Sequence, residues 1–107
     1  MKITELKTEL ENRTDYEYVL GKNVLNEDAL TVSGLAKRTE ISIALRNFHP
    51  EVNNGTEYIS VDGTDNRKGY SGHGSPCKSI DEAIEEIDRL AKQYGYKNKG
   101  KQLRLSI

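Results

Sequence analysis

The chain has 107 residues, one cysteine, 35% hydrophobic residues and a formal net charge of −1. This length predicts a single domain over residues 1–107 with a modest core. The small net charge excludes a global electric field that would attract nucleic acid or anionic lipid. A lone cysteine excludes an internal disulfide. No apolar run is long enough to span a bilayer, and the charged N-terminus lacks the apolar core of a signal peptide, so we expect a cytoplasmic protein with no membrane partner.

The N-terminal part of the chain predicts one helix and two strands. Apolar residues three and four apart predict a short helix over residues 2–12. Alternation within Asp15–Lys22 predicts a strand with one buried face, and Leu30 and Val32 predict a second, short strand after a turn.

The middle of the chain predicts a hairpin followed by a long irregular segment. Thr39–Phe48 alternates apolar and polar residues most clearly, the turn residues Asn53-Asn54-Gly55 follow it, and Thr56–Asp62 alternates again. Residues 62–78 hold four of the nine glycines and one of the two prolines, a composition typical of a loop. A brief strand at Lys68–Ser71 is the alternative.

The strongest signal is a long helix over Ser79–Gly95. Its apolar residues form one stripe, and Ser79 with Glu82 three residues later forms the pattern of a capping box. Gly95 is suited to the left-handed residue that ends many helices, with Tyr96 as the apolar contact of a Schellman motif. After it, residues 97–107 are predicted to form a basic tail or a last edge strand.

These elements indicate an α+β fold. We expect a small antiparallel β-sheet of three to four strands, with the N-terminal helix and the long C-terminal helix packed on one face. The predicted core residues are Leu6, Leu10, Ile41, Ile43, Leu45, Ile59, Val61, Ile80, Ile84, Ile87 and Leu90.

The first functional hypothesis is a small non-enzymatic protein-interaction module with an unknown protein partner. The chain has six tyrosines against one phenylalanine and no tryptophan, and tyrosine is enriched at interfaces because it joins apolar area to a polar tip. Small proteins of this kind are common among phage and mobile-element regulators that inhibit host proteins, anti-CRISPR proteins included, and we extend the expectation to that role. The predicted interaction residues are Tyr58, Tyr70, Glu82, Glu85 and Glu86.

The second hypothesis is a nucleic-acid accessory protein that uses the basic tail. The tail carries four cations and no acid, which predicts a weak and salt-sensitive interaction with phosphates. The residues concerned are Lys97, Lys99, Lys101 and Arg104.

A third hypothesis places an anion or phosphate at the glycine-rich segment 69–79, which precedes a helix N-terminus. The segment matches neither the P-loop nor the dinucleotide fingerprint, and Asp81 and Glu82 would repel a phosphate there. The candidate anion-binding residues are Ser71, Gly72, His73, Gly74, Ser75 and Lys78.

Enzymatic chemistry has weaker support in the sequence. His73 and Cys77 are the residue types of a base and a nucleophile, but no third orienting residue is evident. Together with His49 they supply at most three metal ligands without a paired motif. We therefore expect no enzyme, no metal and no cofactor.

Overall fold

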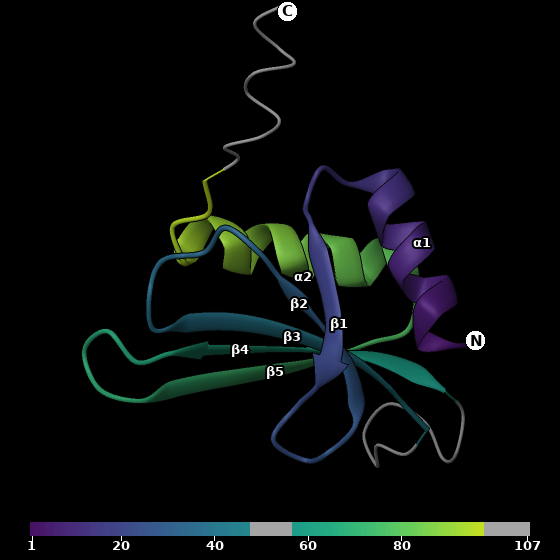
Figure 1. Ribbon diagram of the computed structural model, residues 1–107, viewed down its shortest axis with the longest axis horizontal. Coiled ribbons are helices and arrows are strands. Elements are labelled where there is room, and N and C mark those ends of the chain that lie inside the picture. Colours follow the sequence, from purple (N-terminus) through teal and green to yellow (C-terminus); the bar gives the residue numbers. More distant parts are fainter. Residues whose placement is uncertain (48–56, 98–107) are drawn as a thin grey trace, which may run out of the picture.

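The fold consists of two helices and five strands, seen in a computed structural model that describes residues 1–47 and 57–97 (Figure 1). The chain runs from a helix through all the strands to the second helix. In order, the elements are α1 (Ile3–Arg13), β1 (Tyr18–Lys22), β2 (Asp28–Val32), β3 (Thr39–Arg46), β4 (Tyr58–Asp65), β5 (Ser71–Cys77) and α2 (Ile80–Gln93).

The strands form one antiparallel meander in the order β1-β2-β3-β4-β5. The α+β class and both helices are confirmed, but the predicted count of three to four strands is wrong, because the described sheet has five. The additional strand is β5, which lies in the segment that its composition predicted to be a loop. Residues 48–56, which include the predicted hairpin turn, lie outside the described residues, as does the tail at residues 98–107.

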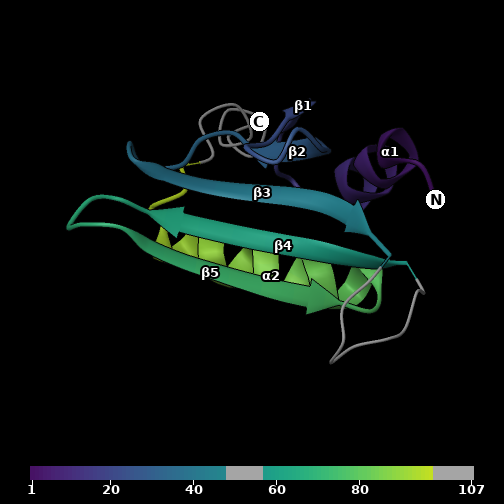
Figure 2. The same ribbon diagram turned by 90° about the horizontal axis from the view of Figure 1, so that it is seen from below.

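Both helices cover the same face of the sheet (Figure 2). Helix α1 packs on β1 and β2, while α2 lies across β3, β4 and β5. The opposite face, which we call the open face, carries no helix among the described elements. Neither α1 nor α2 is both long and apolar enough to cross a membrane.

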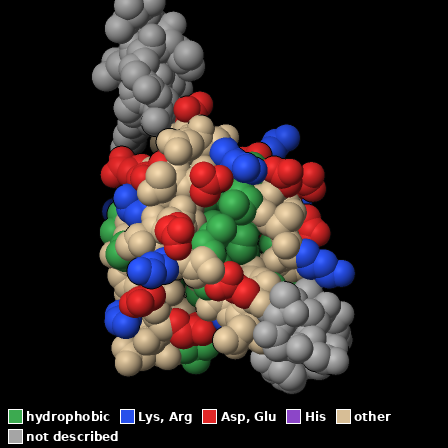
Figure 3. Space-filling view, turned by 90° about the vertical axis from the view of Figure 1, so that its right-hand side faces the viewer, with side chains coloured by type: hydrophobic (Ala, Val, Ile, Leu, Met, Phe, Trp, Pro, Cys, Tyr) green, Lys and Arg blue, Asp and Glu red, His purple; other side chains and the backbone are tan. Residues whose placement is uncertain are grey.

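The core lies between the helices and the sheet. Most of the predicted core residues are buried there, but Leu45, Ile80 and Ile84 are only partly buried at its margin. Viewed from the side of the N-terminus, hydrophobic side chains occupy the centre of the surface, with charged side chains around them (Figure 3). Buried residues outside the predicted core set include Tyr18, Leu30, Val32, Ala83 and Ala91, while Cys77 and Tyr94 are buried as the sequence indicated.

The ends of α2 follow the local sequence signals. Ser79 Oγ accepts a hydrogen bond from the Glu82 N–H at 3.1 Å, while the Glu82 carboxylate accepts from the Lys78 N–H rather than from the expected Ser79 N–H. At the other end Gly95 has φ +70°, and the Tyr96 N–H donates to Ala91 O at 2.9 Å. This six-to-one bond is the first of the two bonds of a Schellman motif, the helix ending that the sequence predicted.

Strand β5 forms in a segment with little intrinsic β propensity. It contains two glycines and Pro76, residue types that weaken strands because they lack side-chain packing or a ladder donor. Two features compensate: seven residue pairs join β5 to β4, and Cys77 is anchored in the core. Pro76 fits because β5 is the last strand in the described order, and an edge strand tolerates a missing N–H on its outer side.

Candidate functional site

The most exposed apolar surface of the described chain is the β1–β2 hairpin. Six large hydrophobic side chains are exposed among the described residues, and four of them belong to this hairpin. Val24 is 100% exposed and Leu25 66% in the turn, while Val19 and Leu20 are 51% and 43% exposed on β1. Because exposed apolar side chains that gather on one element mark interaction sites more often than isolated ones do, this hairpin, and above all its turn pair Val24 and Leu25, is the leading candidate site.

The turn of this hairpin has a defined internal structure. Asn23 Oδ1 accepts hydrogen bonds from the Leu25 N–H at 3.0 Å and from the Glu27 N–H at 2.9 Å. Asn26 takes φ +62°, a left-handed conformation that asparagine tolerates better than most residues. The backbone is therefore fixed by its polar residues, and Val24 and Leu25 project into solvent without contributing to the core.

A network of hydrogen bonds and ion pairs around Glu27 and Arg46 connects the turn to the sheet. Asn23 Nδ2 donates to Glu27 Oε1 at 2.8 Å, and Arg46 Nη2 donates to the same oxygen at 2.8 Å. Arg46 also donates to Ser60 Oγ at 2.9 Å, and its Nη2 lies 3.4 Å from Asp62 Oδ2. The hydrogen bonds from Arg46, and then from Asn23, lower the pKa of Glu27. The carboxylate therefore stays ionised and keeps the turn in place at neutral pH.

The two tyrosines predicted for the interaction surface have opposite environments. Tyr70 is 76% exposed just before β5, whereas Tyr58 is only 5% exposed. The expectation that Tyr58 lies on the surface is wrong. Tyr58 occupies the open-face side of β4, since its neighbour Ile59 belongs to the core and adjacent residues of a strand point to opposite faces. Even on that side of the sheet, its ring is covered.

The acidic residues predicted for the interaction surface lie on α2 and have different roles. Glu82 caps the helix through the Lys78 N–H. Glu86 pairs with Arg89 and lies 3.8 Å from His73 Nε2. Glu85 is exposed. Two of the three carboxylates thus already have structural partners within the chain, which reduces the charge that they present to another molecule.

The glycine-rich segment does not form the predicted loop in front of α2. Residues 71–77 are β5, and successive side chains of a strand point to opposite faces. Ser71, His73 and Ser75 share the helix side with Cys77, while Gly72 and Gly74 belong to the open face. The predicted anion-binding residues therefore do not converge on a single cradle; Lys78 is exposed just after the strand.

His73 and Cys77 lie on one side of β5 without forming a nucleophile–base pair. His73 Nε2 is 3.0 Å from Ser75 Oγ, while the Cys77 thiol points to the Ser75 carbonyl oxygen at 3.7 Å. Burial, followed by the charges of Glu86 and Glu82, raises the pKa of Cys77 to about 11. An activated cysteine has a lowered pKa, so this environment is that of a structural thiol.

We expect Cys77 to react slowly with a thiol reagent such as an aromatic disulfide. With a pKa of about 11 instead of 9.0, the thiolate fraction at pH 8 is about a hundredfold lower, and burial adds a steric barrier. Stopped-flow absorbance in native buffer and in concentrated urea checks this, with the unfolded chain as its own control. A native rate equal to the unfolded rate would show an accessible, ordinary thiol.

The predicted basic tail is described only at its beginning. Lys97 is exposed, and its backbone N–H donates to Gly34 O at 2.9 Å. Lys99, Lys101 and Arg104 lie outside the described residues. Within residues 1–47 and 57–97, no cluster of three or more histidine, cysteine, aspartate or glutamate side chains is arranged to hold a metal ion.

Sequence reasoning missed the exposed hairpin residues. The available signal was the pair Val24-Leu25 between two asparagines, because apolar residues inside a polar turn have no strand or helix to bury them. Comparison with protein-family models, with curated proteins and with solved structures found no match for this chain.

Proposed function

We propose that this protein is a non-enzymatic protein-interaction module that holds a partner protein at its β1–β2 hairpin. The observation that supports the proposal is the exposure of Val24 and Leu25 on a turn that hydrogen bonds to Asn23 hold in place. Because the backbone of this turn is already ordered by hydrogen bonds, a partner that covers these side chains pays for their rotamer freedom but not for ordering the loop.

The edge of the sheet supports the same proposal. Strand β1 is first in the described strand order and has a described neighbour only on its β2 side. An extended segment of a partner could pair with such an edge through its backbone, a common mode of peptide recognition. Val19 and Leu20, on opposite faces of β1, would then contact alternate side chains of the added strand. Inhibition of a host protein in the cytoplasm is one use of such docking.

The test is affinity capture from lysate of the source cell with nuclease present, followed by binding assays on the purified partner. We expect the double variant Val24→Asp, Leu25→Asp to weaken binding at least tenfold, because buried apolar contacts dominate interface energy and both residues are exposed. Asn23→Ala should weaken binding less, since it loosens the turn but keeps both apolar side chains.

Tyr70→Asp is the matched control, because Tyr70 is similarly exposed but lies at the other end of the sheet, in the β4–β5 turn. Circular dichroism should show all variants folded. Binding that survives in the hairpin double variant and disappears in Tyr70→Asp would contradict the proposal and place the interface elsewhere.

A further inference from the structure

Three segments distant in sequence meet at one end of the molecule, which we call the basic end. They are the β2–β3 loop at residues 33–38, the β4–β5 turn at residues 66–70 and the last turn of α2 with residues 94–97 (Figure 1). Backbone hydrogen bonds join them: Ala36 N–H to Tyr94 O at 2.9 Å, Lys97 N–H to Gly34 O at 2.9 Å and Asn66 N–H to Arg38 O at 2.8 Å.

Most of the cations that are unpaired within residues 1–47 and 57–97 gather at this end. Five cationic side chains here form no ion pair or side-chain hydrogen bond within those residues: Lys37, Arg38, Lys68, Lys92 and Lys97. Elsewhere most cations are paired, as in Lys7 with Glu11 and Lys22 with Asp28. The sequence continues beyond Lys97 with three further cations and no acid.

An exposed aromatic ring lies at the same end of the molecule, in the β4–β5 turn that carries Lys68. Tyr70 is 76% exposed, and its hydroxyl oxygen lies 2.6 Å from the point where a Cβ on Gly72 would sit. The ring is therefore held over the open-face side of β5, in space that the glycine leaves empty. Gly72 is the register partner of Thr64, so the ring lies next to that residue on the sheet surface.

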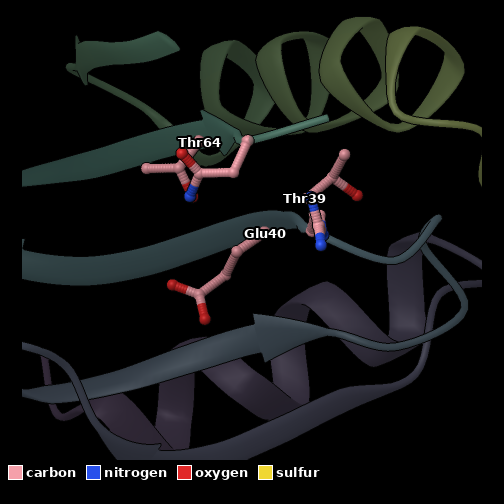
Figure 4. A pocket seen from close by; sticks show the side chains of 5 residues that line it. Thr39, Glu40 and Thr64 are labelled. Carbon is pink, nitrogen blue, oxygen red and sulfur yellow. The ribbon is translucent and has the colours of Figure 1, made fainter. Parts of the chain in front are cut away.

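The surface beside the ring is hollowed. A hollow of about 410 Å³ is lined by Arg38, Thr39, Glu40, Thr64 and Asn66. Figure 4 shows Glu40 and Thr64 on neighbouring strands, with the Glu40 carboxylate directed away from Thr64 and Thr39. The lining thus offers the polar groups of Arg38, Thr64 and Asn66, while the Thr39 hydroxyl donates to Ala36 O at 2.6 Å. The Glu40 carboxylate, the one acid of the lining, points away from the two threonines (Figure 4).

We infer that the basic end binds single-stranded nucleic acid, with the five unpaired cations on phosphates and Tyr70 stacked on a base. Sequence-tolerant single-strand binding combines these two features, and bases stacked inside a duplex would not be available to an exposed tyrosine. The net charge of −1 gives no long-range attraction, so binding rests on local contacts and falls with salt. This site is separate from the β1–β2 hairpin and is independent of the proposed protein partner.

The test measures fluorescence anisotropy of labelled oligothymidylate and oligouridylate, of a duplex and of phosphatidylserine vesicles, across a series of salt concentrations. We expect the single strands to bind most tightly. Lys37→Ala with Lys68→Ala should reduce the slope of log affinity against log salt by about 1.4, because each phosphate that a cation neutralises contributes about 0.7 to that slope. Tyr70→Ala should lower affinity roughly tenfold at every salt concentration, and Tyr70→Phe should restore it.

The matched control replaces two cations away from this end, with Lys2→Ala and Lys78→Ala, and so makes the same change in net charge. It should leave affinity and slope unchanged, as should the hairpin variant Val24→Asp, Leu25→Asp. The inference is overturned if the single strands do not bind at low salt, if the vesicles or the duplex bind more tightly, or if the control pair weakens binding as much as the test pair.

Discussion

Replacing Ile87 with alanine is expected to lower the free energy of unfolding by about 3 kcal/mol. Ile87 is fully buried at the centre of α2, where the helix crosses the sheet. The truncation removes apolar area from the core and leaves a cavity that neighbouring residues cannot fill completely. Urea denaturation followed by circular dichroism measures the change, provided that the dependence of the unfolding free energy on denaturant stays constant.

Ile84→Ala is the matched control for this variant. It makes the same chemical change one turn earlier in the same helix, so the effect on helix propensity is the same. Since Ile84 is only partly buried, we expect it to cost less than half as much as Ile87→Ala. Equal losses would show that the two residues are equally important to the core, contrary to their different burial.

Gly63→Ala is expected to cost about 2 kcal/mol, although alanine suits a strand better than glycine does. A Cβ on Gly63 would lie 2.6 Å from the Tyr94 hydroxyl and 3.0 Å from Leu90 Cδ1. Both side chains are almost fully buried, so they have little room to move. The glycine is therefore what allows the last turns of α2 to approach β4.

Gly21→Ala serves as the control for Gly63→Ala, because it adds the same methyl group to a strand where no atom lies within 4 Å. We expect its stability to equal or slightly exceed that of the wild type. Thermal unfolding of the two variants compares them directly. If Gly21→Ala lowers the unfolding temperature as much as Gly63→Ala does, the effect comes from the backbone and the packing explanation is contradicted.

Local signals were sufficient for the helices and for four of the strands. The stripe of α2, its serine cap and Gly95 are encoded within a short stretch of sequence, and alternation marks β3 and β4 without reference to distant residues. Strand β5 could not be predicted this way. Its glycines and Pro76 favour a loop locally, and its pairing with β4 becomes apparent only when the strands meet.

The candidate sites depend still more on tertiary structure. Tyr58 and Tyr70 are chemically identical, and alternation placed Tyr58 on the surface, but the fold buries it. The basic end combines Arg38, Lys68 and Lys92 from three separate segments, so no linear motif contains it. The exposed pair Val24-Leu25 was visible in the sequence, but its significance depended on knowing that Asn23 holds the turn.

The meander has a consequence for how the chain reaches its native state. Every described strand pairs only with its neighbours in sequence, so no strand pairing must wait for a segment from a distant part of the chain. Folding rates of small proteins rise as contacts become more local, because less chain entropy is lost before the contacts form. The sheet can therefore grow one hairpin at a time, with α2 docking onto β3, β4 and β5 after those strands have been synthesised.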